Sequence, residues 1–457
     1  MDYSAANAEL WNLIIQLGFI GCAIVFANML RRKVPFMRKM LLPVSVMAGF
    51  ILLILKTAGI YKPAMETLEM LVYHCIALGF IAMSLRTAVP ETDKNAKLIG
   101  FKSGAVIVGT YLIQAMVGLG ITLVLAYTIM PDMFKAAGLL LPMGYGQGPG
   151  QANNIGGSYE SMGFVGGRSF GLSIAAAGYV CACTLGVFIL NRWKKNGLLA
   201  NARGEDFDET KLPGFFQDSN EIPVADSVDK FSMQAVMVLI VYLATYLTTW
   251  GLTSAISAIS AGLANLVNSL LWGFNFIIGS VLAMVVRVGL AKGQKIGLVT
   301  RQYQNNYLLN RISGFFFDLM IVAGIASIDT GDISGLLLPF ALMAITGAIV
   351  TWGYLYVVCK RTYGSYYREG LISMYGMLTG TIGSGVLLLR EIDPDLHTPA
   401  ANNLVVGSSY GIVLGAPLLV FVSLAAQNTL MCVLTLALII GYWGLLTFVL
   451  MRKPKNK

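Results

Sequence analysis

Long apolar runs separated by short polar stretches make up most of this chain. A helix needs about 20 apolar residues to cross the ~30 Å hydrocarbon core of a bilayer. Two uncharged stretches are too long for one helix, and we expect them to divide at a Ser/Gly/Asn-rich piece, 251–268, and at the turn Gln427-Asn428-Thr429. The predicted transmembrane helices are then, approximately, 10–30, 40–57, 67–85, 103–130, 168–191, 231–250, 268–286, 308–328, 333–359, 402–426 and 430–451.

Composition agrees with this pattern. Charged residues are 12% of the chain, hydrophobic residues are 56%, and the mean hydropathy is +0.71. A soluble protein of this length has too much surface for so few charges, which excludes a water-soluble enzyme and a disordered chain. The six cysteines lie in or at the ends of apolar segments and form no disulfide framework or zinc spacing. We therefore expect an all-α polytopic membrane protein of about eleven transmembrane helices.

The net charge of +9 is concentrated after alternate spans and predicts the orientation in the membrane. Lys and Arg accumulate in cytoplasmic loops of membrane proteins, so this charge indicates loop bias and not nucleic-acid binding. We expect the N-terminus outside and the C-terminus in the cytoplasm. The basic residues after spans one, three, five, seven, nine and eleven are Arg31, Arg32, Lys33, Arg38 and Lys39; Arg86, Lys94, Lys97 and Lys102; Arg192, Lys194 and Lys195; Arg287, Lys292, Lys295 and Arg301; Lys360, Arg361 and Arg368; and Arg452, Lys453, Lys455 and Lys457.

Two Gly-rich segments, at 138–157 and 370–385, suggest an internal repeat. When Gly138 is placed on Gly370, four glycines or leucines of the two segments coincide, and span 103–130 lies over span 333–359. Each half would contribute five spans, an odd number, so the second half would enter the membrane from the opposite side, as in many secondary transporters. The predicted organisation is a first repeat at 1–195 with a hairpin near 136–160, a polar cytoplasmic linker at 196–230, a second repeat at 231–428 with a hairpin near 366–390, and an extra C-terminal helix and basic tail at 429–457.

The Gly-rich segments are also the candidate binding site. Alternating glycines with Pro149 among them do not suit a helix interior, and broken backbone at membrane depth is tolerated only against protein or a water-filled cavity. The alternative is close helix packing through small residues. Candidate substrate-binding residues are Gly146, Gln147, Gly148, Gln151, Asn153, Asn154, Thr379, Gly380, Thr381 and Ser384, and candidate cation ligands are Gly144 and Gly376.

The run Gly-Tyr-Gly-Gln-Gly-Pro-Gly-Gln-Ala at 144–152 resembles the Gly-rich hairpin of bacterial sodium:glutamate symporters, and 376–384 resembles that family's second motif. The resemblance covers roughly 10–428. It implies two inverted five-span repeats with re-entrant hairpins, a homodimer in a bacterial inner membrane, sodium-coupled glutamate uptake and elevator-type motion. Gln147, Pro149 and Gly383 stand where that family has His, Thr and Pro, so transport of another organic anion is the second hypothesis.

One acidic residue lies inside a predicted span. Asp318 follows three phenylalanines, and a charge at such a position is expensive and usually functional. It is a candidate sodium or proton site; the alternative is a structural pair with Arg287 or Arg311. His74 is expected to be a hydrogen-bonded structural residue, although its ordinary pKa would allow it to titrate near neutral pH.

These observations favour a secondary transporter with sodium as coupling ion, a small anionic solute and membrane lipids as partners, and no other cofactor. The alternatives are a proton- or sodium-coupled carrier of a dicarboxylate or hydroxycarboxylate, an intramembrane enzyme and a channel. The enzyme is disfavoured because no nucleophile with a neighbouring base is visible. A channel would normally build its pore from like subunits, whereas this chain carries two unlike hairpins.

Overall fold

The computed structural model describes residues 7–35, 37, 41–87, 94–196, 224–259, 271–273, 275–297, 303–393 and 398–452. Every regular element in these ranges is a helix. The chain divides into two compact units: unit 1 comprises residues 1–73, 91–199 and 319–457, and unit 2 comprises 74–90 and 200–318. Each unit combines stretches from both predicted repeats.

The described residues contain ten helical segments that are long and apolar enough to cross a membrane, which indicates a multi-pass membrane protein. They correspond to ten of the eleven predicted spans. The eleventh, predicted at 40–57, is the shorter helix α3 (Val44–Thr57), whose 14 residues give a length of about 21 Å at 1.5 Å per residue. All-α architecture is therefore confirmed for the described residues.

Two predicted boundaries were wrong. Helix α5 (Lys94–Thr128) begins well before the predicted start at 103. Helix α8 (Val224–Ile259) runs through Gly251, where we expected a connecting piece to begin. The Thr253 and Ser257 hydroxyls donate to backbone carbonyls of the preceding turn, at 3.0 and 2.8 Å. A single glycine within a helix costs only about 1 kcal/mol relative to alanine. The rest of that predicted piece, 260–268, lies outside the described residues.

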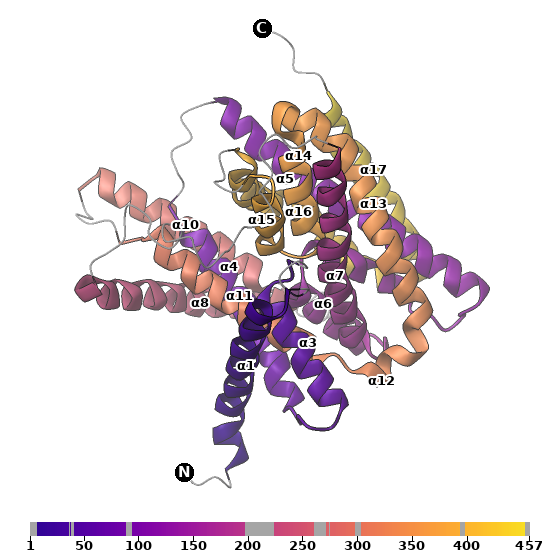
Figure 1. Cartoon of the computed structure of the whole chain (residues 1–457), viewed down its shortest axis with the longest axis horizontal. Helices are drawn as coiled ribbons and strands as arrows, with labels where there is room; N and C mark the ends of the chain where they lie inside the picture. The colour runs from indigo at the N-terminus through magenta and orange to yellow at the C-terminus, as the bar shows by residue number, and fades with distance from the viewer. Residues whose placement is uncertain are drawn as a thin grey trace. The chain divides into compact units, whose positions relative to one another are not determined.

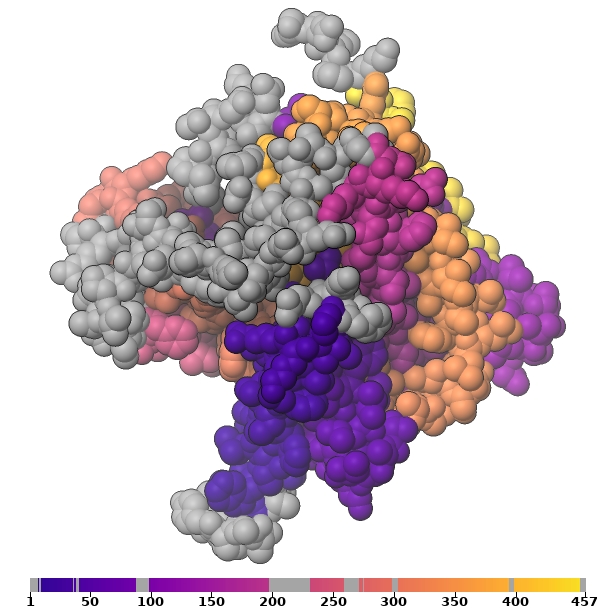
Figure 2. Space-filling model, in the orientation of Figure 1, coloured from indigo at the N-terminus to yellow at the C-terminus, as the bar shows by residue number. Residues whose placement is uncertain are grey.

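Unit 1 holds most of the helices. In chain order they are α1 (Ala8–Lys33), α3, the first part of α4 (Met65–Leu85), α5, η1 (Lys135–Leu139), η2 (Pro142–Gly146), α6 (Pro149–Ser161), α7 (Gly167–Lys195), the end of α11 (Asn306–Ser327), α12 (Thr330–Ile333), η4 (Ser334–Leu336), α13 (Leu337–Tyr363), η5 (Gly364–Tyr366), α14 (Tyr367–Thr379), α15 (Ile382–Arg390), α16 (Ala400–Ala425) and α17 (Thr429–Met451). Helix α5 packs against α13, α16 and α17. Helices α13 and α17 run side by side, and α7 adjoins α13 at the surface (Figures 1 and 2).

Small residues allow close backbone approach within unit 1. Gly118 of α5 faces Gly138 of η1, and a Cβ on either glycine would overlap the backbone of the other. The predicted turn at 427–429 is also confirmed, because the Asn428 side chain accepts the Met431 N–H at 2.9 Å and caps the start of α17.

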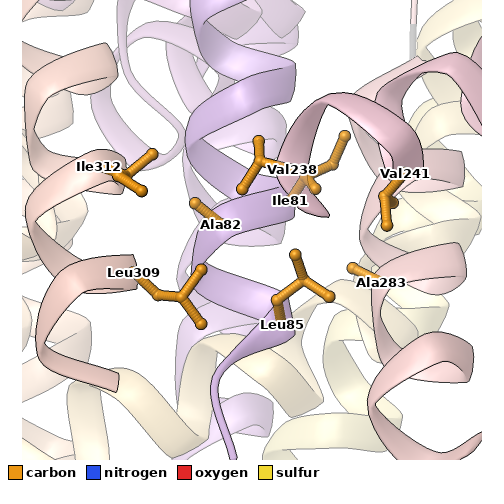
Figure 3. Packing of buried hydrophobic residues seen from close by; sticks show 8 residues of the cluster. All are labelled: Ile81, Ala82, Leu85, Val238, Val241, Ala283, Leu309 and Ile312. Carbon is orange, nitrogen blue, oxygen red and sulfur yellow. The ribbon is translucent and has the colours of Figure 1, made fainter. Parts of the chain in front are cut away.

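Unit 2 consists of the second part of α4, α8, α10 (Asn275–Lys295) and the first part of α11. Its core is a cluster of aliphatic side chains from all four helices (Figure 3). The residues of the cluster are Ile81, Ala82, Leu85, Val238, Val241, Ala283, Leu309 and Ile312. Gly79, two residues before Ile81 on α4, lies so close to Phe317 that a Cβ would be 2.6 Å from the ring.

Several basic residues predicted to follow the spans lie in or next to the last turns of helices. They are Arg31, Arg32 and Lys33 of α1, Arg192, Lys194 and Lys195 of α7, Lys292 and Lys295 of α10, and Lys360 and Arg361 of α13. Cations at these ends complement the helix dipole. Most of the predicted cytoplasmic linker at 196–230 lies outside the described residues, but its last seven residues, 224–230, are helical and form the start of α8, so the predicted end of the linker was wrong.

Candidate functional site

The first Gly-rich segment is helical on both sides of a short break. The π-helical turn η2 ends at Gly146. The backbone N–H of the following residue, Gln147, donates to the Pro142 carbonyl at 3.1 Å. Gly148 then has φ +87°, a conformation that glycine adopts without strain. Pro149 begins α6, because a proline is tolerated at the first position of a helix and disfavours helical backbone in the residue before it.

This geometry narrows the predicted break. We expected non-helical backbone across the alternating glycines, but Gly144 and Gly146 lie within η2, and only Gln147 and Gly148 separate it from α6. Gly144 packs against α7, where a Cβ would lie 2.8 Å from the Ala175 nitrogen.

The second Gly-rich segment has the same plan. Helix α14 ends at Thr379, Gly380 and Thr381 are non-helical, and α15 begins at Ile382. A Cβ on Gly380 would lie 2.9 Å from the Ser384 hydroxyl and 3.0 Å from the Tyr179 ring, so a larger residue here would require these neighbours to shift.

The two breaks meet inside unit 1, and we call their meeting point the crossing. A Cβ built on Gly148 lies 3.7 Å from the Gly380 carbonyl oxygen and 3.8 Å from Cγ2 of Thr381. Helix α7 packs against both segments at Gly178, where a Cβ would overlap the carbonyl oxygen of Thr379 and lie 2.9 Å from the Tyr145 ring. Segments from the two halves of the sequence are therefore brought together.

Four helix ends come together at the crossing. Helices α6 and α15 begin there, and neither first residue is capped by a side chain. The turn η2 and helix α14 end there. Helix N-termini favour negative charge and C-termini favour positive charge. The backbone alone thus offers donors for an anion and acceptors for a cation.

Buried side chains next to the breaks lack hydrogen-bond partners among the described residues. Both amide atoms of Gln151, the Asn153 Oδ1 and the Ser384 hydroxyl are in this position, although Gln151 is only 1% exposed and Ser384 2%. A buried polar group without a partner costs about 1–3 kcal/mol. Polar side chains on α6 and α15 that are held at this cost are suited to binding a polar ligand.

The remaining predicted binding residues are buried or half-buried, and some are already hydrogen-bonded or packed against backbone. Asn154 is buried, and Gln147 and Thr381 are half-buried. The Thr379 hydroxyl donates to the Tyr375 carbonyl at 2.8 Å. Gly376, predicted as a cation ligand, lies within α14, and a Cβ there would be 2.9 Å from the Ser384 carbonyl oxygen.

The two ionisable residues predicted inside spans, His74 in 67–85 and Asp318 in 308–328, belong to unit 2. Asp318 is its last residue and has an exposed side chain. His74 forms a 2.6 Å hydrogen bond through Nδ1 with the Tyr242 hydroxyl, as expected for a structural histidine. The crossing, by contrast, is built wholly from unit 1.

A charged cluster in unit 1 was missed from the sequence. Arg168, at the start of α7, pairs with Glu69 of α4, and its Nε lies 3.3 Å from Glu160 of α6. The Arg168 backbone N–H also donates to Glu160 at 3.0 Å. Partial burial raises the pKa of Glu160, which lies outside the ten candidate spans; the Arg168 hydrogen bond opposes this rise and Asp332 adds to it. The only signal in the sequence was the presence of single charges beside apolar runs.

Comparison of the sequence with models of known protein families and with curated proteins finds no match.

Proposed function

We propose that this chain is a secondary active transporter that couples sodium entry to the uptake of glutamate or a related small anionic amino acid. The observation that carries the proposal is the crossing, where Gly148 faces Gly380 and Thr381 beside buried, unpartnered polar side chains. In secondary transporters, discontinuous helices near the bilayer midplane form the solute and ion sites.

The helix ends at the crossing are suited to bind both the anionic solute and the sodium ion. The uncapped N-termini of α6 and α15 provide N–H donors for a carboxylate, and the C-terminal carbonyls of η2 and α14 provide oxygen ligands for sodium. Gln151, Asn153 and Ser384 add neutral groups that orient the solute. Binding would then recover the cost of burying these groups.

The proposal includes the membrane topology. We propose that the two broken segments are re-entrant hairpins of two inverted five-span repeats, that the N-terminus lies outside a bacterial inner membrane, and that the protein works as a homodimer by elevator-type motion. The support is the sequence resemblance, the repeated helix–break–helix plan and the basic residues at alternate helix ends. The C-terminal helix α17 lies outside the repeat.

The test is uptake by purified protein in proteoliposomes. Labelled L-glutamate is offered with an inward sodium gradient, with a proton gradient, or with neither. The proposal predicts accumulation that requires sodium. Accumulation driven only by a proton gradient would replace sodium as the coupling ion in the proposal. Accumulation of a dicarboxylate but not of glutamate would replace glutamate as the solute. Folded protein that transports nothing would refute the proposal.

Two variants connect transport to the crossing. Ser384→Ala removes a buried, unpartnered hydroxyl and should raise the half-saturating solute concentration about tenfold, since about 1.4 kcal/mol corresponds to that factor. Thr435→Val removes an equally buried, unpartnered hydroxyl on α17, outside the broken segments, and should leave that concentration unchanged. Equal effects of the two changes would remove Ser384 from the site.

Asp318 is proposed as a site of the coupling ion. Asp318→Asn should then abolish uptake or separate it from the ion gradient, because the amide carries no negative charge. Transport at the wild-type rate with the same ion dependence would exclude Asp318 from coupling.

A further inference from the structure

Gln114 is a buried amide in the middle of α5, a helix that the sequence shows as an ordinary apolar span. Its side chain is 0% exposed. An amide in such a position is costly to bury unless its hydrogen-bonding groups are used. Within unit 1, the Gln114 amide nitrogen donates two hydrogen bonds, whereas its oxygen accepts none from the described residues. The nitrogen lies beside the second break and the oxygen beside the first.

The Gln114 amide nitrogen holds the end of α14. It donates at 2.9 Å to the carbonyl of Leu378 and at 2.8 Å to the hydroxyl of Thr351 on α13. Leu378 is in the last turn of α14, and the last four carbonyls of a helix have no partner within it. A side chain of α5 therefore pairs with a carbonyl that the second break leaves free.

This pairing fixes the direction of the amide. A carbonyl can only accept a hydrogen bond, so the nitrogen and not the oxygen of Gln114 must face Leu378. The oxygen, Oε1, then faces the end of η2: a Cβ built on Gly146 lies 3.0 Å from it. Within the described residues, Oε1 has no donor, and it is buried.

We infer that Gln114 joins the two breaks, holding the Leu378 carbonyl with its nitrogen and providing with Oε1 a neutral oxygen ligand for a monovalent cation beside Gly146. The inference rests on the proposed function, because it assigns a residue to the cation that the transporter couples. Two features favour a monovalent ion. The groups assembled at the crossing are neutral amides, hydroxyls and carbonyls, and the described residues contain no cluster of three or more His, Cys, Asp or Glu for a divalent metal.

The first experiment measures cation binding without transport. Purified full-length protein is unfolded by heat in detergent with increasing sodium chloride, with choline chloride at matched ionic strength as reference. Gln114→Leu, which keeps the volume and removes both polar atoms, should raise the half-maximal sodium concentration at least about tenfold. An unchanged half-maximal concentration would overturn the inference.

The matched control is Gln234→Leu in unit 2. Gln234 is 1% exposed and also joins two chain segments, donating to the Tyr303 carbonyl at 2.6 Å and accepting the Asn305 N–H at 3.1 Å. Its loss should lower the unfolding temperature without changing the half-maximal sodium concentration. An equal shift of that concentration in both variants would show that loss of any buried amide produces the effect, and would overturn the inference.

A second experiment separates positioning from general destabilisation. In Gln114→Glu, a protonated carboxyl keeps one donor for Leu378 and one acceptor oxygen, whereas a carboxylate has no donor. Sodium-dependent uptake by this variant, relative to wild type, should therefore rise as the pH falls. A ratio independent of pH would contradict the positioning role. Wild-type protein that shows neither sodium-dependent stabilisation nor uptake would refute the proposed function and, with it, the inference.

Discussion

Replacing Gly178 by alanine tests whether α7 packs directly against both broken segments. The new methyl group would overlap the Thr379 carbonyl oxygen and lie 2.9 Å from the Tyr145 ring, closer than the 3.4 Å at which ordinary contact begins. One partner is backbone, which cannot rotate away, so α7 or the end of α14 must move. Overpacking of this kind costs about 1–3 kcal/mol, and alanine returns up to about 1 kcal/mol through its higher helix propensity.

We therefore expect Gly178→Ala to lose about 1–2 kcal/mol of stability and most of its uptake, because the displaced atoms lie next to both breaks. The assays are thermal unfolding in detergent and initial uptake rate in proteoliposomes at equal amounts of folded protein. The control is Gly120→Ala in α5, where a Cβ would meet nothing within 4 Å. The control should be as stable as wild type or more so. Wild-type stability and uptake in Gly178→Ala would refute the close approach of α7 to the crossing.

Three further predictions follow from individual contacts. Gly148→Ala should lose uptake, whereas Gly297→Ala, also at positive φ but with open space around it, should only lose about 1–2 kcal/mol of stability; equal uptake by both would separate Gly148 from transport. Lys56→Met should lower the unfolding temperature, because Nζ donates to the carbonyls of Ala326, Ser327 and Ile328 at the C-terminal end of α11, at 3.3, 3.3 and 2.8 Å. An unchanged unfolding temperature would count against these hydrogen bonds. Burial raises the Glu160 pKa, so its proton is held more tightly in the folded state, and its contribution to stability is present at low pH and is lost as pH rises through the raised pKa. Glu160→Gln should remove that part of the pH dependence of unfolding, and an unaltered pH profile would contradict the shift.

The helices were predictable because a long apolar run in a chain with so few charges has few alternatives to a helix. The breaks were predictable for a local reason as well: Gly148 before Pro149 cannot continue a helix, and Gly380 is followed by the β-branched Thr381. Helix boundaries were less predictable. A single glycine such as Gly251 does not end α8, in which nearby Thr and Ser hydroxyls donate to carbonyls of the same helix.

The partners of the breaks were not predictable from the sequence. Gln114 and Leu378 lie in different halves of the chain, and no pattern along α5 distinguishes Gln114 from a lipid-facing amide. The pairing of Arg168 with Glu69 joins two helices that are also distant in the sequence. Local sequence determines where the backbone breaks, whereas tertiary packing determines which side chains meet the break.

The most direct test of the central claim, that the crossing binds both the solute and the cation, is hydrogen exchange followed by mass spectrometry. The purified protein is compared in choline chloride, in sodium chloride, and in sodium chloride with L-glutamate. The account predicts slower exchange at 142–152 and at 376–386 together when sodium and glutamate are both present, because the free N–H groups at the starts of α6 and α15 acquire acceptors. Slower exchange elsewhere with no change in these two segments would contradict it.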